Sequence, residues 1–93
     1  MYKGVIHMMK SLSFVEGTCV WKPERTGDYE IDCAKGRSYA EELLQFIRSR
    51  QAPQVFGHVS RAMTDGGIFD GVETGFCSVI GIHICVSAES VSN

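Results

Sequence analysis

The sequence lacks the short motifs that most often assign a function directly. It contains neither GxxxxGK[ST] nor GxGxxG, so the two common phosphate-binding loops are excluded. No two of its four cysteines lie two to four residues apart, the spacing from which structural zinc sites usually start. We therefore expect no metal and no cofactor. The four cysteines are Cys19, Cys33, Cys77 and Cys85.

Charge is missing from the most apolar part of the chain. Residues 75–88 contain no Asp, Glu, Lys or Arg. A transmembrane helix needs about 20 apolar residues, whereas this run is shorter and is interrupted by Gly81 and His83. The run predicts a core element or a contact between subunits, and we expect no membrane association.

The first ten residues lack the basic region, apolar stretch and small-residue cleavage site of a signal peptide. This points to the cytoplasm, where cysteines are normally thiols. The 93 residues predict one small domain, 1–93. A domain of this size buries only about 60 to 70% of its unfolded surface, so association of subunits is expected to add stability.

Charge is also distributed unevenly. Residues 35–61 carry five basic and two acidic side chains, a net charge of +3, whereas residues 62–93 carry four acidic side chains and no basic ones. The simplest interpretation is that the two segments neutralise each other within the fold or between subunits. The alternative is a nucleic-acid-binding regulator. Its phosphate contacts would be Arg37, Arg48, Arg50 and Arg61.

The first third of the chain predicts β-structure. Residues 2–8 alternate in a way that permits a strand. Residues 13–21 and 29–33 are rich in Val, Thr and aromatic side chains, and the intervening Pro23 and Gly27 favour a turn. We predict an antiparallel hairpin.

Two helices are predicted next. Ser38 and Glu41 match a capping box, and apolar residues recur at intervals of three and four after it. Pro53 suits the first position of a second helix, which Gly66 and Gly67 would end.

The last element, residues 71–86, permits two readings. Apolar β-branched residues at alternate positions favour a strand, whereas Asp70 and Glu73 form a cap and a helical projection collects the apolar residues on one face. We prefer the helix. The predicted fold class is therefore α+β, with an N-terminal hairpin packed against three helices. The alternative places the last element as a strand in a three- or four-stranded sheet.

No constellation in the sequence defines an active site. On a strand, Cys77, His83 and Cys85 would share a face, with Cys19 or Cys33 as a distant fourth zinc ligand. His58 or His83 could in principle act as the base for the thiol of Cys33 or Cys77. Neither set has a local signature. We predict a small non-enzymatic module that forms homo-oligomers or binds a protein partner, and nucleic acid is not an expected partner. The predicted interface is Phe76, Val79, Ile80 and His83.

Overall fold

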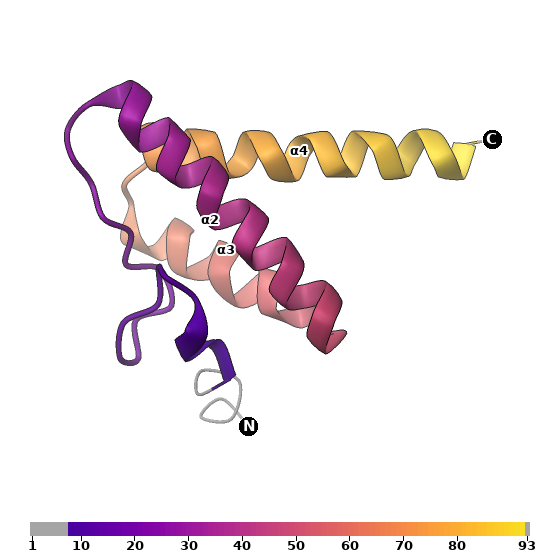
Figure 1. The fold of residues 1–93 in the computed structure, drawn as a ribbon, viewed down its shortest axis with the longest axis horizontal. Coiled ribbons are helices and arrows are strands. Elements are labelled where there is room, and N and C mark those ends of the chain that lie inside the picture. The colour runs from indigo at the N-terminus through magenta and orange to yellow at the C-terminus, as the bar shows by residue number, and fades with distance from the viewer. Residues whose placement is uncertain (1–7, 93) are drawn as a thin grey trace.

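The computed structural model describes residues 8–92, and the side chains of residues 8–85. Along the chain come a short 3₁₀ helix, η1 (Met9–Ser11), and three α-helices, α2 (Tyr29–Arg50), α3 (Gln54–Gly66) and α4 (Gly71–Ser92) (Figure 1). Within this part of the chain, β-pairing is limited to an isolated bridge between Glu16 and Cys19. The predicted α+β fold is therefore wrong, because the described fold is helical.

Helix α2 begins much earlier than the sequence predicts. The side chain of Asp28, in extended conformation, accepts a hydrogen bond of 3.1 Å from the Ile31 amide and caps the helix. The predicted strand 29–33 is thus the start of α2, with Tyr29 and Ile31 on its exposed side. The capping box predicted at Ser38 is wrong, because Ser38 lies inside the helix that Asp28 starts.

Glycine in the middle of α2 allows a very close contact with α4. A Cβ atom on Gly36 would lie 1.9 Å from the carbonyl oxygen of Val72, and one on Gly75 would lie 2.0 Å from that of Cys33. Because glycine has no side chain, the two helix backbones can touch here. Helix interiors normally disfavour glycine by about 0.5 to 1 kcal/mol, and this packing offsets that cost.

In place of the predicted hairpin, residues 12–28 form an irregular segment whose aromatic residues enter the core. Phe14 and Trp21 contact Tyr39 of α2 and Phe76 of α4, with ring centroids 5.0 to 6.2 Å apart. The pattern that predicts a strand in residues 13–21 therefore reflects packing against helices. The predicted strand 2–8 lies outside the described residues, except for Met8.

The ends of α3 and the start of α4 follow the local signals in the sequence. Pro53 directly precedes α3, and Gly67 ends it in the left-handed conformation with φ 73°. At α4, the Asp70 amide donates to Glu73 Oε1 at 3.1 Å, and Asp70 Oδ1 accepts from the Val72 amide at 3.3 Å. This cap confirms the helical prediction for the last element and excludes the strand alternative.

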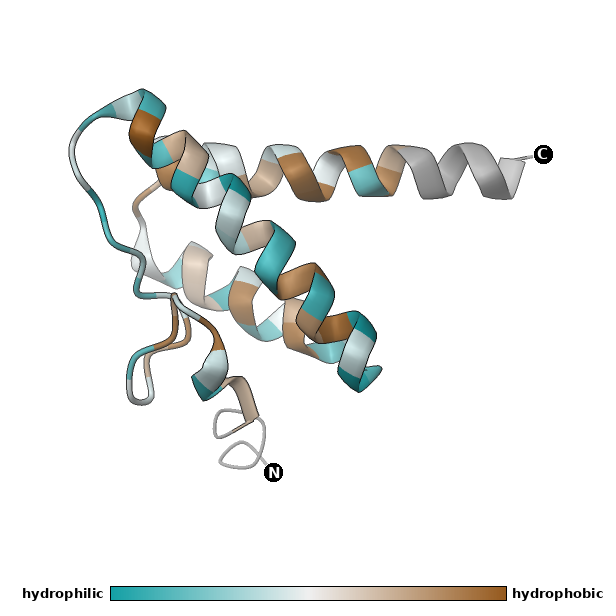
Figure 2. Cartoon of the chain, viewed as in Figure 1, coloured by the Kyte–Doolittle hydropathy of each residue, from teal (hydrophilic) through white to brown (hydrophobic). Residues whose placement is uncertain are grey.

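The helices form an open corner. Helix α2 packs across the first half of α4, and the C-terminal end of α2 points away from α4 (Figure 1). Helix α3 ends near the start of α4, and its N-terminal end lies away from α4 (Figure 1). We call residues 81–92 the α4 arm, because this part of the helix stands clear of α2 and α3 in Figure 1. Apolar residues continue along α4 as far as its side chains are described (Figure 2).

Candidate functional site

An apolar groove lies inside the corner, between α3 and α4. We call it the α3/α4 groove; its volume is about 160 Å³. Two of its apolar side chains are accessible, since Phe56 on α3 is 37% exposed and Ile84 on the arm is 60% exposed. The lining residues are Phe56, Ser60, Met63, Phe76, Cys77, Ile80, Gly81 and Ile84.

The α4 arm carries a wide apolar face that is open to solvent. Ile82 and Ile84 are 63% and 60% exposed, and His83 lies between them. At about 100° per residue, these three positions span about 200° of the helix surface. Cys85 falls outside this span, on the side that we call the outer side of the arm. The apolar face continues the sides of α4 that contact α2 and α3 farther back.

The structure divides the predicted interface residues between two environments. Phe76 and Val79 are buried in the core of the chain itself, where Phe76 contacts Trp21. Ile80 is half-buried just before the arm, and His83 is half-buried on the arm. The exposed apolar residues of this region are therefore Ile82 and Ile84, which the sequence prediction did not include in the interface.

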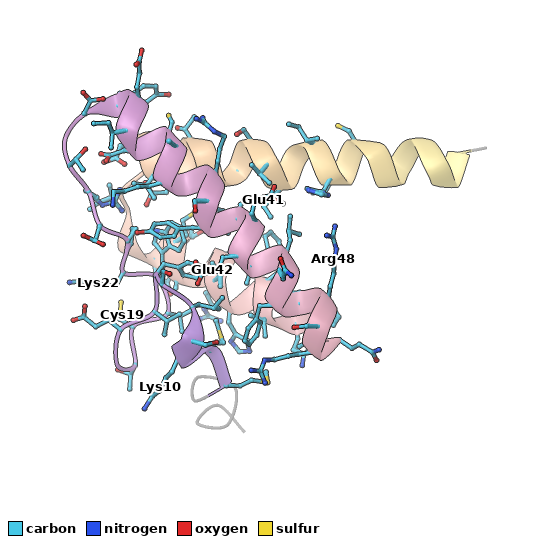
Figure 3. The ribbon with its side chains drawn as sticks, viewed as in Figure 1. Lys10, Cys19, Lys22, Glu41, Glu42 and Arg48 are labelled. Carbon is cyan, nitrogen blue, oxygen red and sulfur yellow. The ribbon has the colours of Figure 1, made fainter. Side chains whose placement is uncertain are left out.

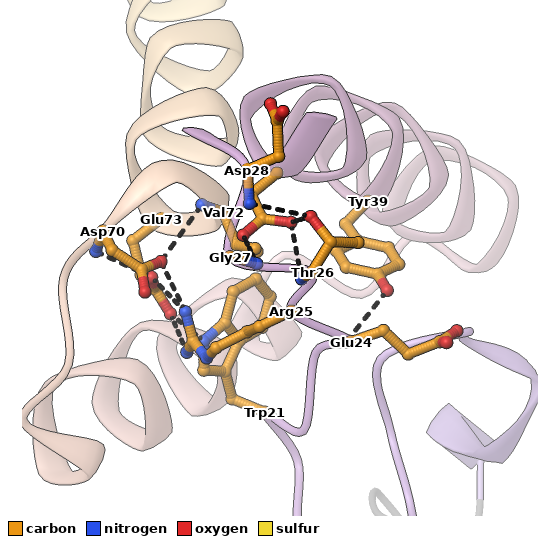
Figure 4. Close-up of polar contacts among 11 residues, drawn as sticks. Trp21, Glu24, Arg25, Thr26, Gly27, Asp28, Tyr39, Asp70, Val72 and Glu73 are labelled. Atoms are coloured by element: carbon orange, nitrogen blue, oxygen red, sulfur yellow. Dashed lines mark hydrogen bonds and ion pairs between the residues drawn. The ribbon is translucent and has the colours of Figure 1, made fainter. Parts of the chain in front are cut away.

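A network of polar groups around the buried Glu73 fixes the start of α4 (Figure 4). Glu73 is 0% exposed, and both of its carboxylate oxygens accept hydrogen bonds from Arg25, at 2.9 and 2.5 Å. Trp21 Nε1 donates to Glu73 Oε2 at 2.8 Å, and Arg25 also contacts Asp70 at 2.6 Å. The network ties the irregular segment to the first turn of α4, so it helps to set the direction of the helix.

These contacts keep Glu73 ionised. Burial alone would raise its pKa, but the hydrogen bonds from Arg25, Trp21 and the Asp70 amide outweigh burial and lower the pKa to about 2. The same hydrogen bond with Glu73 raises the pKa of Arg25. Because its two oxygens are already engaged by protein donors, the carboxylate serves structure.

A second buried carboxylate, Asp32, organises the loop before α2. It accepts from the amide and the hydroxyl of Thr26, at 2.9 and 2.7 Å, and from the Gly27 amide at 3.2 Å. Hydrogen bonds from Thr26 lower the pKa of Asp32, and the hydrogen bond from the Gly27 amide has a smaller effect in the same direction. Asp32 thus holds the loop in the conformation that places Asp28 at the helix cap.

The four arginines predicted to contact phosphate are spread over two helices. Arg37 and Arg48 lie on α2, separated by about 16 Å along the helix axis, at about 1.5 Å per residue. Arg50 stacks on Phe46 with its guanidinium carbon 4.8 Å from the ring centroid, and Arg61 lies 3.8 Å from Asp65 on α3. All four are exposed, and Figure 3 shows Arg48 together with the acidic Glu41 on the same helix.

The structure also separates the residues of the weaker chemical predictions. On a helix, Cys77, His83 and Cys85 point in different directions, so the face that would favour zinc on a strand does not form. In the described part of the chain, no group of three or more metal-binding side chains is close enough to hold an ion. Burial and the nearby Glu73 raise the pKa of the Cys77 thiol, which disfavours the reactive thiolate.

A larger groove of mixed polar and apolar lining lies between the irregular segment and α3. Its volume is about 530 Å³, and Arg61 and Asp65 pair within it. His58 lines this groove, whereas Cys77 lines the α3/α4 groove, so a base and a thiol suggested by the sequence lie in different grooves. The lining residues are Thr18, Val20, Gln54, Gly57, His58, Arg61, Ala62 and Asp65.

Two features of the site escaped sequence reasoning. The pairing of Glu73 with Arg25 joins residues 48 positions apart and has no local signature. The close helix contact does have one, because Gly71 and Gly75 are four residues apart, a spacing typical of helices whose backbones touch. The spacing of Gly71 and Gly75 thus indicates that another helix packs against the start of α4.

Comparison of the chain with protein-family models, curated proteins and solved structures finds no match. Among the helices of residues 8–92, none combines the length and hydrophobicity needed to cross a membrane.

Proposed function

We propose that this protein is a small non-enzymatic interaction module that forms oligomers through the apolar face of its α4 arm. One observation carries the proposal: Ile82 and Ile84 are both more than half exposed on a part of α4 that stands clear of the other helices. A helix with so wide an apolar surface is normally covered by other protein.

The energetic argument gives the expected strength of the contact. Burying an Ile or Phe side chain fully contributes about 1.5 to 3 kcal/mol. Phe56, Ile82 and Ile84 are roughly half exposed, so the six side chains of a dimer would contribute about 5 to 9 kcal/mol. Association itself costs about 4 to 15 kcal/mol. These side chains alone support a weak complex, so the remaining arm surface has to contribute to a stable one.

The proposal places the module in the cytoplasm. All four cysteines are thiols in the structure, and three of them, Cys19, Cys77 and Cys85, are exposed. Exposed thiols suit a reducing compartment, since an oxidising one would expose them to disulfide formation.

Light scattering coupled to size-exclusion chromatography tests the proposed function. At micromolar concentration, under reducing conditions, the measured mass should exceed the 10.3 kDa of one chain and should decrease on dilution. A mass of 10.3 kDa over the whole concentration range would refute oligomer formation.

A further inference from the structure

We propose that the partner of the α4 arm is the arm of a second copy of the same chain. The two arms would lie antiparallel about a two-fold axis, each inside the corner of the other copy and against its α3/α4 groove. This inference rests on the proposed function and specifies the partner and its orientation.

The shape of the chain is self-complementary. A concave apolar site, the α3/α4 groove, lies beside a protruding apolar element, the arm, and Ile84 belongs to both. In a two-fold dimer the same surface patch serves both copies. Two corners facing each other can therefore place the projecting arm of each copy in the recess of the other.

The charge pattern favours an identical partner. The segment 75–88 contains no charged side chain, so two such segments can pack together without repulsion between like charges. A charged partner helix would instead leave its charges without counter-ions against Phe56, Ile80 and Ile84. A second copy supplies an uncharged surface of the same length, residues 75–88.

The available area is sufficient. Residues 81–92 form a cylinder about 18 Å long and about 10 Å wide, with a lateral surface of about 560 Å². If half of each arm is covered, the two arms and the surfaces against them lose about 1,100 Å² in total, which exceeds the about 1,000 Å² expected of a specific interface. Contact through the α3/α4 groove is needed to reach this value, because two crossed arms alone bury less.

Paired charge substitutions on the arm test the location of the contact. Ile84→Glu places a carboxylate on the apolar face, whereas the control Cys85→Glu places the same charge on the outer side, one residue away. We expect Ile84→Glu to weaken association at least tenfold and Cys85→Glu to leave it within about twofold, with equal helicity by circular dichroism. A greater loss with Cys85→Glu than with Ile84→Glu would overturn the proposal.

Disulfide formation between two differently marked chains tests the orientation. In a background with the four native cysteines replaced by serine, one chain carries Ser60→Cys in the α3/α4 groove and the other carries Ser90→Cys near the end of α4, because antiparallel arms place the end of one arm against the start of the other. Mixing and mild oxidation should give a covalent heterodimer, because each arm lies against the partner's groove. The control pair combines Ser60→Cys with Arg37→Cys, on the exposed surface of α2, and should give little product.

The outcomes separate the two proposals. If the wild-type chain oligomerises but Ser60→Cys and Ser90→Cys do not cross-link above the control, the antiparallel arrangement is wrong and the interaction module stands. If the wild-type chain is monomeric at every concentration, both proposals are wrong.

Discussion

Gly36 of α2 lies directly against the backbone of Val72 in α4, where a Cβ atom would come within 1.9 Å of the Val72 carbonyl oxygen. The atom in the way belongs to the backbone, so no change of side-chain rotamer can relieve the clash. The two helices would have to separate. This contact therefore requires glycine at position 36, in the middle of α2.

Gly36→Ala should accordingly lower the free energy of unfolding by about 1 to 3 kcal/mol or more, because overpacking usually costs this much. Gly57→Ala on α3 is the matched control, since a Cβ there has no atom within 4 Å. Because alanine favours helix over glycine, we expect the control to gain about 0.5 to 1 kcal/mol. Urea denaturation followed by circular dichroism measures both, and equal effects of the two changes would refute the close contact.

Stability should fall in acid because of Glu73. Its pKa is about 2 in the folded protein and 4.5 in its ordinary range, so the folded state favours the carboxylate. The contribution is complete above the unfolded pKa and is lost as pH falls toward the folded pKa, between about pH 5 and pH 2. A shift of this size corresponds to roughly 3 kcal/mol. Asp32, whose pKa is also lowered, adds in the same direction.

Glu73→Gln distinguishes the contribution of Glu73 to the pH dependence of stability from that of Asp32. The variant should be less stable near neutral pH, because Arg25 loses its buried partner, and its stability should depend less on pH than that of the wild-type chain. Denaturation curves collected across this pH range provide the comparison. An unchanged pH dependence would show that Glu73 does not titrate in the way its contacts imply.

The true start of α2 can be tested with two alanine substitutions. Asp28→Ala removes the side chain that caps the helix and should cost about 0.5 to 2 kcal/mol. Ser38→Ala, at the position where the sequence suggests a cap, should cost nothing measurable, because Ser38 is exposed inside the helix. Thermal or urea unfolding distinguishes them, and a larger effect at Ser38 would contradict the helix boundary.

Duplex DNA should bind weakly. Each phosphate contact would contribute a slope of about −0.9 to the dependence of log affinity on log salt concentration. Because Arg50 stacks on Phe46 and Arg61 is paired with Asp65, we expect no steep slope. Fluorescence anisotropy at low salt measures it. Micromolar, salt-dependent binding that disappears in the triple Arg→Ala variant would reverse this expectation.

Local signals in the sequence predicted the helix boundaries that depend on local contacts. The end of α3 follows from the left-handed conformation available to Gly67, and the start of α4 follows from the reciprocal cap of Asp70 and Glu73. Both act within a few residues, so spacing alone reveals them. The same reasoning correctly preferred a helix for the apolar last element, despite its β-branched residues.

The predicted hairpin failed because its aromatic side chains have distant partners. Phe14 and Trp21 pack against Tyr39 and Phe76, which are contributed by α2 and α4. β-Propensity largely measures how well a side chain packs on its neighbours, and here the neighbours are helices. The exposed part of the apolar face of α4 was only partly predictable for a related reason. Helical periodicity identified the apolar face, but which half of that face the chain covers depends on where α2 crosses.

The glycine contact between α2 and α4 is the point about which a change in the crossing angle would rotate the α4 arm. From Gly75 to the end of α4 is about 26 Å, so a rotation of about 10° at the crossing would move the helix end by about 4 Å. That displacement is close to the width of a side chain. Substitutions at Gly36, Gly75 or Arg25 can therefore redirect the arm without touching it, and a chain that still folds could lose its fit to a partner.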